Sequence, residues 1–271
     1  MLPQLDLHFS PMGDGRTVIK SGYSRFPLRH SPAVYLFESF PTLTSCFVTN
    51  SSGGLFENDQ LEICIRMDAG SNVQLLNLSA TPIHKSDKLA ACEVLRVQMG
   101  DDAYLELERK PLIPMVDSRY EQSSFFEIGR RSVAVIAETV FSGRFSSGER
   151  HGYTELKLGL DVTCSGERLV SERTGLRTGG GISALRSDSG WNCMGTVYCI
   201  GVDRDWKTIQ QDAILTLDDP MIGFGHLPNN TGLIARFLCN SADAASVRIE
   251  TLLKNFRSYF AEDFTQRRAA E

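Results

Sequence analysis

The sequence predicts a mainly β protein made of many short strands, with two helices in the C-terminal third. Short runs that alternate apolar and polar residues dominate the first two thirds of the chain, as in Leu61-Glu-Ile-Cys-Ile-Arg66. This alternation is the pattern of half-buried strands. Tight polar turns separate the runs and recur about every 30 residues, a spacing that fits hairpins stacked along one axis. The repeat is too weak to define a solenoid by itself.

Three segments share the same order of strand, polar turn and strand, namely residues 66–79, 98–108 and 126–138. Gly70, Gly100 and Gly129 mark the turns within them, because glycine permits tight turn geometry. Residues 165–167 form a further turn between two runs. The expected strands are Thr44–Val48, Leu61–Met67, Val73–Leu78, Glu93–Met99, Ala103–Leu107, Ser123–Ile128, Ser132–Val140, Thr154–Val162 and Arg168–Arg173.

Two segments near the C-terminus carry helix signals. Asp205 is placed to cap a helix that runs to about residue 215. For the second helix, Ser241 and Asp243 are the candidate N-caps, and apolar residues follow at helical spacing. The resulting apolar stripe comprises Val247, Leu252, Leu253, Phe256 and Phe260.

The chain is expected to form one domain, residues 1–271, with a disordered tail from about residue 262 to 271. A chain of this length buries enough apolar surface to fold without disulfides or a structural metal. Gly179-Gly180-Gly181 is expected to be a flexible loop and is the best break point in the chain. No linker composition surrounds this loop, so we do not expect a domain boundary there.

Composition excludes several classes of protein. The net charge of −5 implies no broad cationic surface, which argues against nucleic-acid binding. No apolar run approaches the roughly 20 residues that span a bilayer, and the first residues lack the pattern of a signal peptide. The seven cysteines are scattered, and none forms a Cys-x-x-Cys pair. We therefore expect reduced thiols and a cytoplasmic location, with no membrane contact.

The sequence carries no catalytic signature. A nucleophile elbow, a phosphate-binding Walker loop and a dinucleotide fingerprint are all missing. The triple glycine precedes Ile182-Ser183, without the lysine that would reach a phosphate. No histidine pair has the spacing of a metal-binding helix, and no cysteine lies at ligand spacing from a histidine. We expect neither an enzyme nor a preformed metal cage.

The carboxylates are the more informative polar residues. Most acidic residues lie on solvated strand faces, but Glu138 follows the apolar run Val133–Ala137 and precedes Val140. A buried carboxylate must be paired or hydrated. Two interpretations carry equal weight: an ion pair with Arg144 that holds a hairpin, or a carboxylate that lines a wet internal passage. The other carboxylates of interest are Asp59, Glu62, Asp117 and Glu149.

Six short motifs, in order along most of the chain, resemble the urease accessory protein UreD family, also called UreH. Each motif is weak alone, and the order and spacing of the set make the resemblance strong. They are Arg16–Ile19 with Pro27–Arg29; Gly53-Gly54-Leu55 with Asp59; Leu75–Thr81; Pro111–Tyr120; Glu138 with Gly143-Arg144 and Gly148-Glu149; and Gly232–Arg236.

The resemblance implies a flattened β-helix-like stack of strands with two helices near the C-terminus. It also implies a non-enzymatic scaffold that binds a UreF-like helical protein, a UreG-like GTPase and apo-urease. Members of this family are thought to pass Ni²⁺ through a hydrated internal channel, so we expect nickel in transit and no permanently bound cofactor. Scattered oxygen ligands suit passage better than storage. The transient metal contacts expected on this basis are Glu138, Glu149, Asp59, Glu62 and Asp117, supported by Arg144, Ser118 and Tyr120.

The chain departs from the family pattern at the paired glycine. Asn50-Ser51-Ser52 replaces His-Pro-Pro, Glu57-Asn58 replaces a second glycine pair, and Pro82 replaces a lysine. A diverged member serving a target other than urease is therefore an alternative, as is an interaction scaffold with no channel. A third is a β-helix enzyme acting on acidic polysaccharide through Lys110, Asp117 and Arg119. We expect a partner-binding surface at Leu252, Leu253 and Phe256, with Gly180 nearby.

Overall fold

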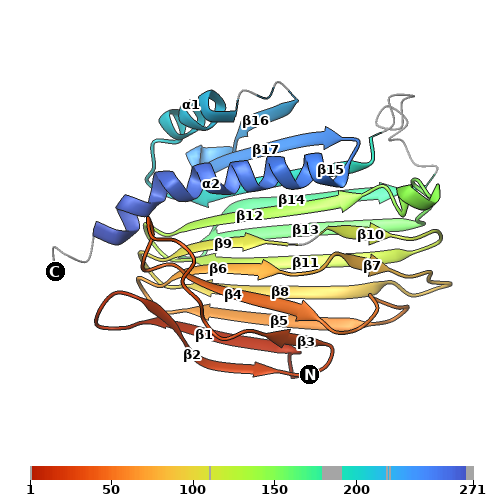
Figure 1. The fold of residues 1–271 in the computed structure, drawn as a ribbon, viewed down its shortest axis with the longest axis horizontal. Helices are drawn as coiled ribbons and strands as arrows, with labels where there is room; N and C mark the ends of the chain where they lie inside the picture. Colours follow the sequence, from red (N-terminus) through yellow and green to blue (C-terminus); the bar gives the residue numbers. More distant parts are fainter. Residues whose placement is uncertain (1, 110, 179–190, 218, 220, 267–271) are drawn as a thin grey trace.

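The computed structural model describes residues 2–109, 111–178, 191–217, 219 and 221–266. Two large β-sheets stack face to face, and two helices lie against the outer face of one of them (Figure 1). Within this described part, neither helix combines the length and apolar character needed to cross a membrane.

The sheets differ in size. Among the described residues, the first sheet has seven strands, in the order β14 (Glu167–Arg177), β13 (Glu155–Cys164), β11 (Arg119–Ile128), β8 (Ala91–Met99), β5 (Gln60–Met67), β1 (Leu5–Pro11) and β2 (Thr17–Ser24). The second sheet follows the order β16 (Ile222–His226), β17 (Gly232–Cys239), β15 (Cys193–Gly201), β12 (Val133–Phe141), β9 (Tyr104–Glu108), β6 (Asn72–Asn77), β4 (Thr44–Asn50) and β3 (Leu28–His30), with β7 (Thr81–Ile83) and β10 (Leu112–Pro114) attached beside β12.

The chain alternates between the sheets as a flattened coil. From β5 onward, the long strands fall in turn in the first sheet and the second, through β6, β8, β9, β11, β12 and β13. Neighbouring strands of successive coils are parallel. Glu62 lies opposite Val94, and Val94 lies opposite Ser123, so one coil takes about 30 residues, a normal period for a repeat fold. The expected β-helix-like stack is confirmed.

The expectation of stacked hairpins is wrong for these coils. The turn at Gly70 joins β5 to β6, which belong to different sheets, and the turns at Gly100 and Gly129 do the same for the next two coils. A hairpin and a coil share the local pattern of strand, turn and strand, and only the distant pairing partner separates them. The turn at Ser165-Gly166 does close an antiparallel hairpin, between β13 and β14.

Apolar side chains form three separate clusters, which the coil arrangement explains because alternate residues of each strand point to opposite faces. The inner core lies between the sheets and includes Leu95, Phe126, Ala134 and Ile136. The end core also lies between the sheets, nearer one end of the strands, and includes Ala91, Tyr120, Val140 and Leu176. The outer core joins the second sheet to the helices and includes Val133, Val135, Ala137, Trp206 and Phe260.

Both expected helices are present. Helix α1 (Trp206–Leu217) is capped by Asp205, whose carboxylate accepts hydrogen bonds from the Thr208 backbone nitrogen at 3.3 Å and hydroxyl at 2.8 Å. Helix α2 (Ala242–Gln266) starts at the cap Ser241, which accepts a hydrogen bond from the Ala244 nitrogen at 3.1 Å. The short 3-10 helices η1 (Phe145–Ser147) and η2 (Pro228–Asn230) lie in connections.

Helix α2 corrects two expectations. Leu252, Leu253 and Phe256 are 0–2% exposed within the outer core, so they hold the helix on the sheet and are not a free partner surface. The helix also continues to Gln266, into the segment expected to be disordered, because Phe264 packs in the same core. Gly180 and residues 267–271 lie outside the described residues.

Candidate functional site

A layer of polar side chains crosses the space between the two sheets, bounded by the inner core on one side and the end core on the other. On β12, Ala134 and Ile136 belong to the inner core and Val140 to the end core, so Glu138 faces inward between them. The same alternation places polar residues inward on the neighbouring strands. We define the polar layer as Asn77, Arg109, Glu138, Thr196 and Arg236 from the second sheet, with Glu93, Gln122, Ser124, Glu172 and Thr174 from the first.

Strand register makes the polar layer a row that runs across the strands. In the second sheet, Glu138 lies opposite Thr196, and Thr196 lies opposite Arg236. In the first sheet, Glu93 lies opposite Gln122. Arg109 joins the row one residue beyond β9, where its backbone nitrogen donates to Ala137 O at 2.9 Å and extends the ladder with β12.

The centre of the polar layer is a guanidinium shared by two carboxylates. Arg109 forms an ion pair with Glu93, and its Nε lies 3.8 Å from Glu138 Oε1. Its Nη1 also donates to Ser124 Oγ at 3.0 Å. The side chains of Arg109, Glu93 and Glu138 are 11%, 13% and 18% exposed. In the part of the chain that the structure describes, this arrangement is a partly buried, charge-assisted network with one cation for two anions.

Neutral hydrogen-bonding groups surround this charged centre. Gln122 Nε2 donates to Glu138 Oε1 at 2.6 Å, and the Tyr120 hydroxyl donates to Gln122 Oε1 at 3.3 Å. Burial raises the pKa of Tyr120 to about 12, so its hydroxyl remains a neutral donor near neutral pH. Burial, with a smaller contribution from the charge of Glu138, also raises the pKa of Tyr198.

Small cavities flank the centre on both sides. A cavity of about 30 Å³ touches Glu93, Asn50, Asn77 and Thr81, and one of about 20 Å³ touches Glu138, Glu172, Thr174 and Thr196. Polar cavities of this size hold about one water molecule each. Beyond the second cavity, the polar layer reaches an open hollow of about 480 Å³ lined by Thr174, Thr196, Met221, Arg236 and Phe237. There Arg236 forms an ion pair with Glu172.

The expected ion pair between Glu138 and Arg144 is wrong. Arg144 pairs with Glu149, whose Oε2 accepts a hydrogen bond from Arg144 Nε at 2.9 Å. Gly143 makes this local pairing possible, because its φ is +142° and a Cβ there would lie 2.8 Å from Glu149 O. The pair lowers the pKa of Glu149. Arg144 therefore belongs to a surface turn.

The structure does not bring the other expected metal contacts to the polar layer. Asp59 Oδ2 accepts a hydrogen bond from the Phe56 nitrogen at 2.8 Å. Glu62 lies 3.5 Å from Arg96 Nε, and Asp117 lies 3.9 Å from Lys85 Nζ. Two of the three expected supporting residues are buried: Tyr120 borders the layer, and Ser118 is 0% exposed. The third is Arg144, on the surface turn. Lys110, one residue of the proposed polysaccharide site, lies outside the described residues.

Sequence reasoning missed most of the polar layer. Glu93 has the same strand phase as Leu95, Val97 and Met99, which are all buried, so a polar residue at an inward position was the available signal. Gln122 and Ser124 interrupt the inward series of β11 in the same way. Arg109 had no such signal, because it follows its strand and meets Glu93 only through the stacking of the sheets.

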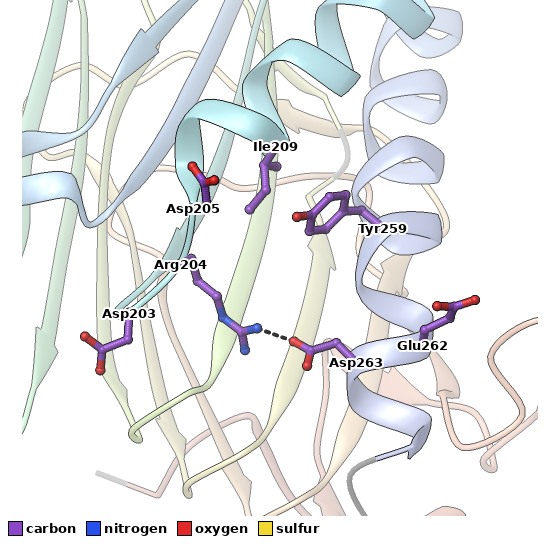
Figure 2. A pocket seen from close by; sticks show the side chains of 7 residues that line it. All are labelled: Asp203, Arg204, Asp205, Ile209, Tyr259, Glu262 and Asp263. Atoms are coloured by element: carbon purple, nitrogen blue, oxygen red, sulfur yellow. Dashed lines mark hydrogen bonds and ion pairs between the residues drawn. The ribbon is translucent and has the colours of Figure 1, made fainter.

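A further hollow, about 640 Å³, lies apart from the polar layer, between the start of α1 and the end of α2 (Figure 2). Arg204 there forms an ion pair with Asp263, donates to Arg131 O at 2.7 Å, and lies 5.6 Å from the ring centre of Phe260. These contacts join the end of α2 to the loop before α1. The lining residues are Asp203, Arg204, Asp205, Ile209, Tyr259, Glu262 and Asp263.

The fold and the polar layer define a class: a two-sheet β-coil whose central strands are parallel, with helices on one outer face and a charged row enclosed between its sheets. Within the described ranges, no group of three or more His, Cys, Asp or Glu side chains is placed to hold a metal ion. The chain belongs to the UreD urease accessory protein family, because the model of that family matches residues 3–270. The resemblance in the motifs is thereby confirmed.

Curated relatives carry the same description. The chain is 28% identical over 258 residues to a urease accessory protein UreD of Cenarchaeum symbiosum, a match that covers 91% of this chain and 88% of the relative. It is 27% identical to a UreD of Mycolicibacterium gilvum over 84% of each chain. It is 22% identical to a UreD of Trichodesmium erythraeum over 94% of each chain.

Proposed function

We propose that this chain is a non-catalytic accessory protein that helps to deliver Ni²⁺ to apo-urease, with the polar layer as the route of the ion. The observation that carries the proposal is the row of inward polar side chains, centred on Glu93, Arg109 and Glu138, that crosses the interior between two apolar cores. An interior that served packing alone would be apolar there, because burying charged groups is costly.

The chemistry of the polar layer suits transit. A borderline divalent cation that moves through protein needs oxygen ligands, water and weak binding, so that it leaves each position. Glu93, Glu138, Glu172 and Gln122 supply oxygens, and the cavities beside them have the size of single water molecules. Nickel is the cargo here, and no permanently bound cofactor is part of the proposal.

The partners in this proposal are apo-urease, a UreF-like helical protein and, through the complex, a UreG-like GTPase, all in the cytoplasm. The hollow at Met221, Arg236 and Phe237 is the end of the polar layer that opens widely to the surface, and it is therefore the place where we expect a partner to meet the route. Co-purification of the chain with a urease subunit and a GTPase tests the partners separately from the route.

Glu138→Gln tests the route. The substitution keeps an oxygen to accept the hydrogen bond from Gln122, and Arg109 keeps its ion pair with Glu93. We therefore expect a loss of stability of only about 1 kcal/mol and unchanged complex formation, with several-fold less nickel in co-expressed urease. Thermal melting, pull-down and metal analysis on the same preparation measure these quantities.

Glu149→Gln is the matched control, because it removes a carboxylate from the surface pair with Arg144. It should leave nickel loading unchanged. If Glu138→Gln folds, assembles and loads nickel like the wild type, the polar layer is not the route, and the alternative of a pure interaction scaffold gains support.

A further inference from the structure

The centre of the polar layer has an unbalanced charge. Among the described residues, Glu93 and Glu138 share the guanidinium of Arg109, which leaves one negative charge in excess at a place where the three side chains are less than one fifth exposed. Partly buried charges are stable only when they are paired and hydrogen-bonded. A divalent cation would balance both carboxylates, whereas Arg109 balances one.

The contacts of Glu138 show the same deficit. The ion pair of Arg109 is made with Glu93, and the 3.8 Å between Arg109 Nε and Glu138 Oε1 is too long for a hydrogen bond. The hydrogen bond to Glu138 comes from the neutral amide of Gln122. Glu138 thus retains acceptor capacity toward a second cation.

Small cavities adjoin both carboxylates. Glu93 lines two cavities of about 30 Å³, a mostly apolar one that Arg109 also lines and one that Asn50, Asn77 and Thr81 line, and Glu138 lines the cavity of about 20 Å³. Water-sized spaces therefore lie beside both carboxylates. The side chain of Arg109 lies where an ion moving along the polar layer would meet both carboxylates at once.

We propose that Glu93 and Glu138 form a latent site for a hydrated divalent cation, and that Arg109 is the resident cation that occupies and closes it. Ser124 Oγ, which accepts a hydrogen bond from Arg109, lies beside the site, and water would complete the coordination of an ion such as Ni²⁺, Co²⁺ or Mn²⁺. The ion enters when the Arg109 side chain swings away. A role of Arg109 as a gate on the nickel route rests on the proposed function, whereas cation binding at Glu93 and Glu138 does not.

Arg109→Gln exposes the site in the tag-free purified chain. The variant keeps a polar side chain and removes the charge, so the two carboxylates lose their shared partner. We expect Ni²⁺ to raise the melting temperature of this variant by several degrees and to bind at least tenfold more tightly than to the wild type in calorimetry. Mn²⁺, as a second oxygen-seeking ion, should act in the same direction.

Three variants sharpen the test. Arg109→Lys keeps the positive charge and should show no gain in cation binding. The double variant Arg109→Gln/Glu138→Gln should lose the gain, because one carboxylate remains. Arg236→Gln removes a guanidinium from the one-to-one pair with Glu172 at the open end, where Arg236 is about half exposed, and should also show no gain.

A folded Arg109→Gln variant that melts and binds Ni²⁺ like the wild type would overturn the inference, as would an equal gain in the double variant. If Arg109→Gln fails to fold, the soluble yield of the single and double variants is compared. A higher soluble yield of the double variant supports an excess negative charge as the cause. Equal insolubility of both variants contradicts the inference. These measurements use no urease. The nickel content of urease therefore tests the delivery role, and cation binding by the purified chain tests the latent site, so each proposal can fail without the other.

Discussion

Two buried groupings of carboxylate and guanidinium lie on opposite faces of the second sheet. On the outer face, Glu106 is 0% exposed, and Arg257 of α2 donates to both of its oxygens, at 2.8 and 2.6 Å. Gln74 Nε2 donates to the same carboxylate at 2.6 Å and the Tyr104 hydroxyl at 3.3 Å. The guanidinium of Arg257 also lies 4.0 Å from the ring centre of Phe37. Every group in this set has its partner.

On the inner face, Arg109 divides its contacts between Glu93, Ser124 and Glu138, and water-sized cavities adjoin both carboxylates. The residue types are the same on the two faces, but the ratio of anions to cations is not. A saturated one-to-one pair fixes a helix on a sheet. A two-to-one group beside cavities keeps unused capacity for a cation, and this difference separates a structural contact from a candidate functional one.

Breaking the saturated pair should have the largest effect. Arg257→Ala leaves Glu106 charged and enclosed, so we expect a loss of about 3–5 kcal/mol in the free energy of unfolding. Urea denaturation followed by circular dichroism measures this loss. Lys254→Ala is the control, because Lys254 is an exposed residue of the same helix, and it should change stability little.

Removing one carboxylate from the group around Arg109 should lower the free energy of unfolding by less. Glu93→Gln leaves Arg109 with Glu138 as its carboxylate partner, so we expect a loss of about 1 kcal/mol, measured by the same denaturation. Glu106→Gln is the matched change on the other face, and it should cost clearly more because Arg257 makes both of its carboxylate hydrogen bonds to Glu106. Equal losses for these two variants would contradict the distinction between the faces.

The smallest effect is expected at the surface pair of Arg144 and Glu149. Arg144→Ala should leave the denaturation midpoint unchanged, since exposed ion pairs contribute little. It should raise the pKa of Glu149 toward its ordinary value, because the hydrogen bond from Arg144 is the main cause of the lowered pKa. Carboxyl chemical shifts followed by NMR during an acid titration measure this change.

The sign of the pH effect follows from the lowered pKa. The pair contributes to stability above the ordinary pKa of the carboxyl group, and the contribution disappears as the pH falls through the folded-state pKa. A large loss of stability at neutral pH in Arg144→Ala would restore the idea that Arg144 neutralises a buried carboxylate.

Local patterns predicted the long strands of the coil from β4 to β14, and they missed strands before and after these. β5 and β8 alternate in sequence and were expected, although each began one or two residues earlier than predicted. β15 was missed because eight of its residues are buried, on both faces, which removes the alternation. β1 alternates between buried and half-buried residues and was not assigned. The coil itself was beyond local signals, because its pairing joins residues about 30 positions apart.

Sequence reasoning identified one charged residue of the polar layer, Glu138. Glu138 was singled out because apolar residues flank it, and the same reasoning applied to the inward phase of β8 would have found Glu93. The wrong partner, Arg144, was chosen because it is near in sequence. Of the actual neighbours, Arg109 comes from the preceding coil and Gln122 from β11, the strand before β12 in the other sheet. Their proximity follows from strand pairing and sheet stacking that no short sequence motif encodes.

The coiled construction also sets the dimensions of the polar layer. Each full coil adds one strand to each sheet, so it extends both walls together by the spacing between neighbouring strands, about 4.8 Å. An inserted coil with polar residues at the inward positions would lengthen the interior row by that increment and leave its width unchanged. The reach of such a protein between two binding partners is therefore adjustable in discrete steps, by duplication or loss of a single repeat, without redesign of the fold.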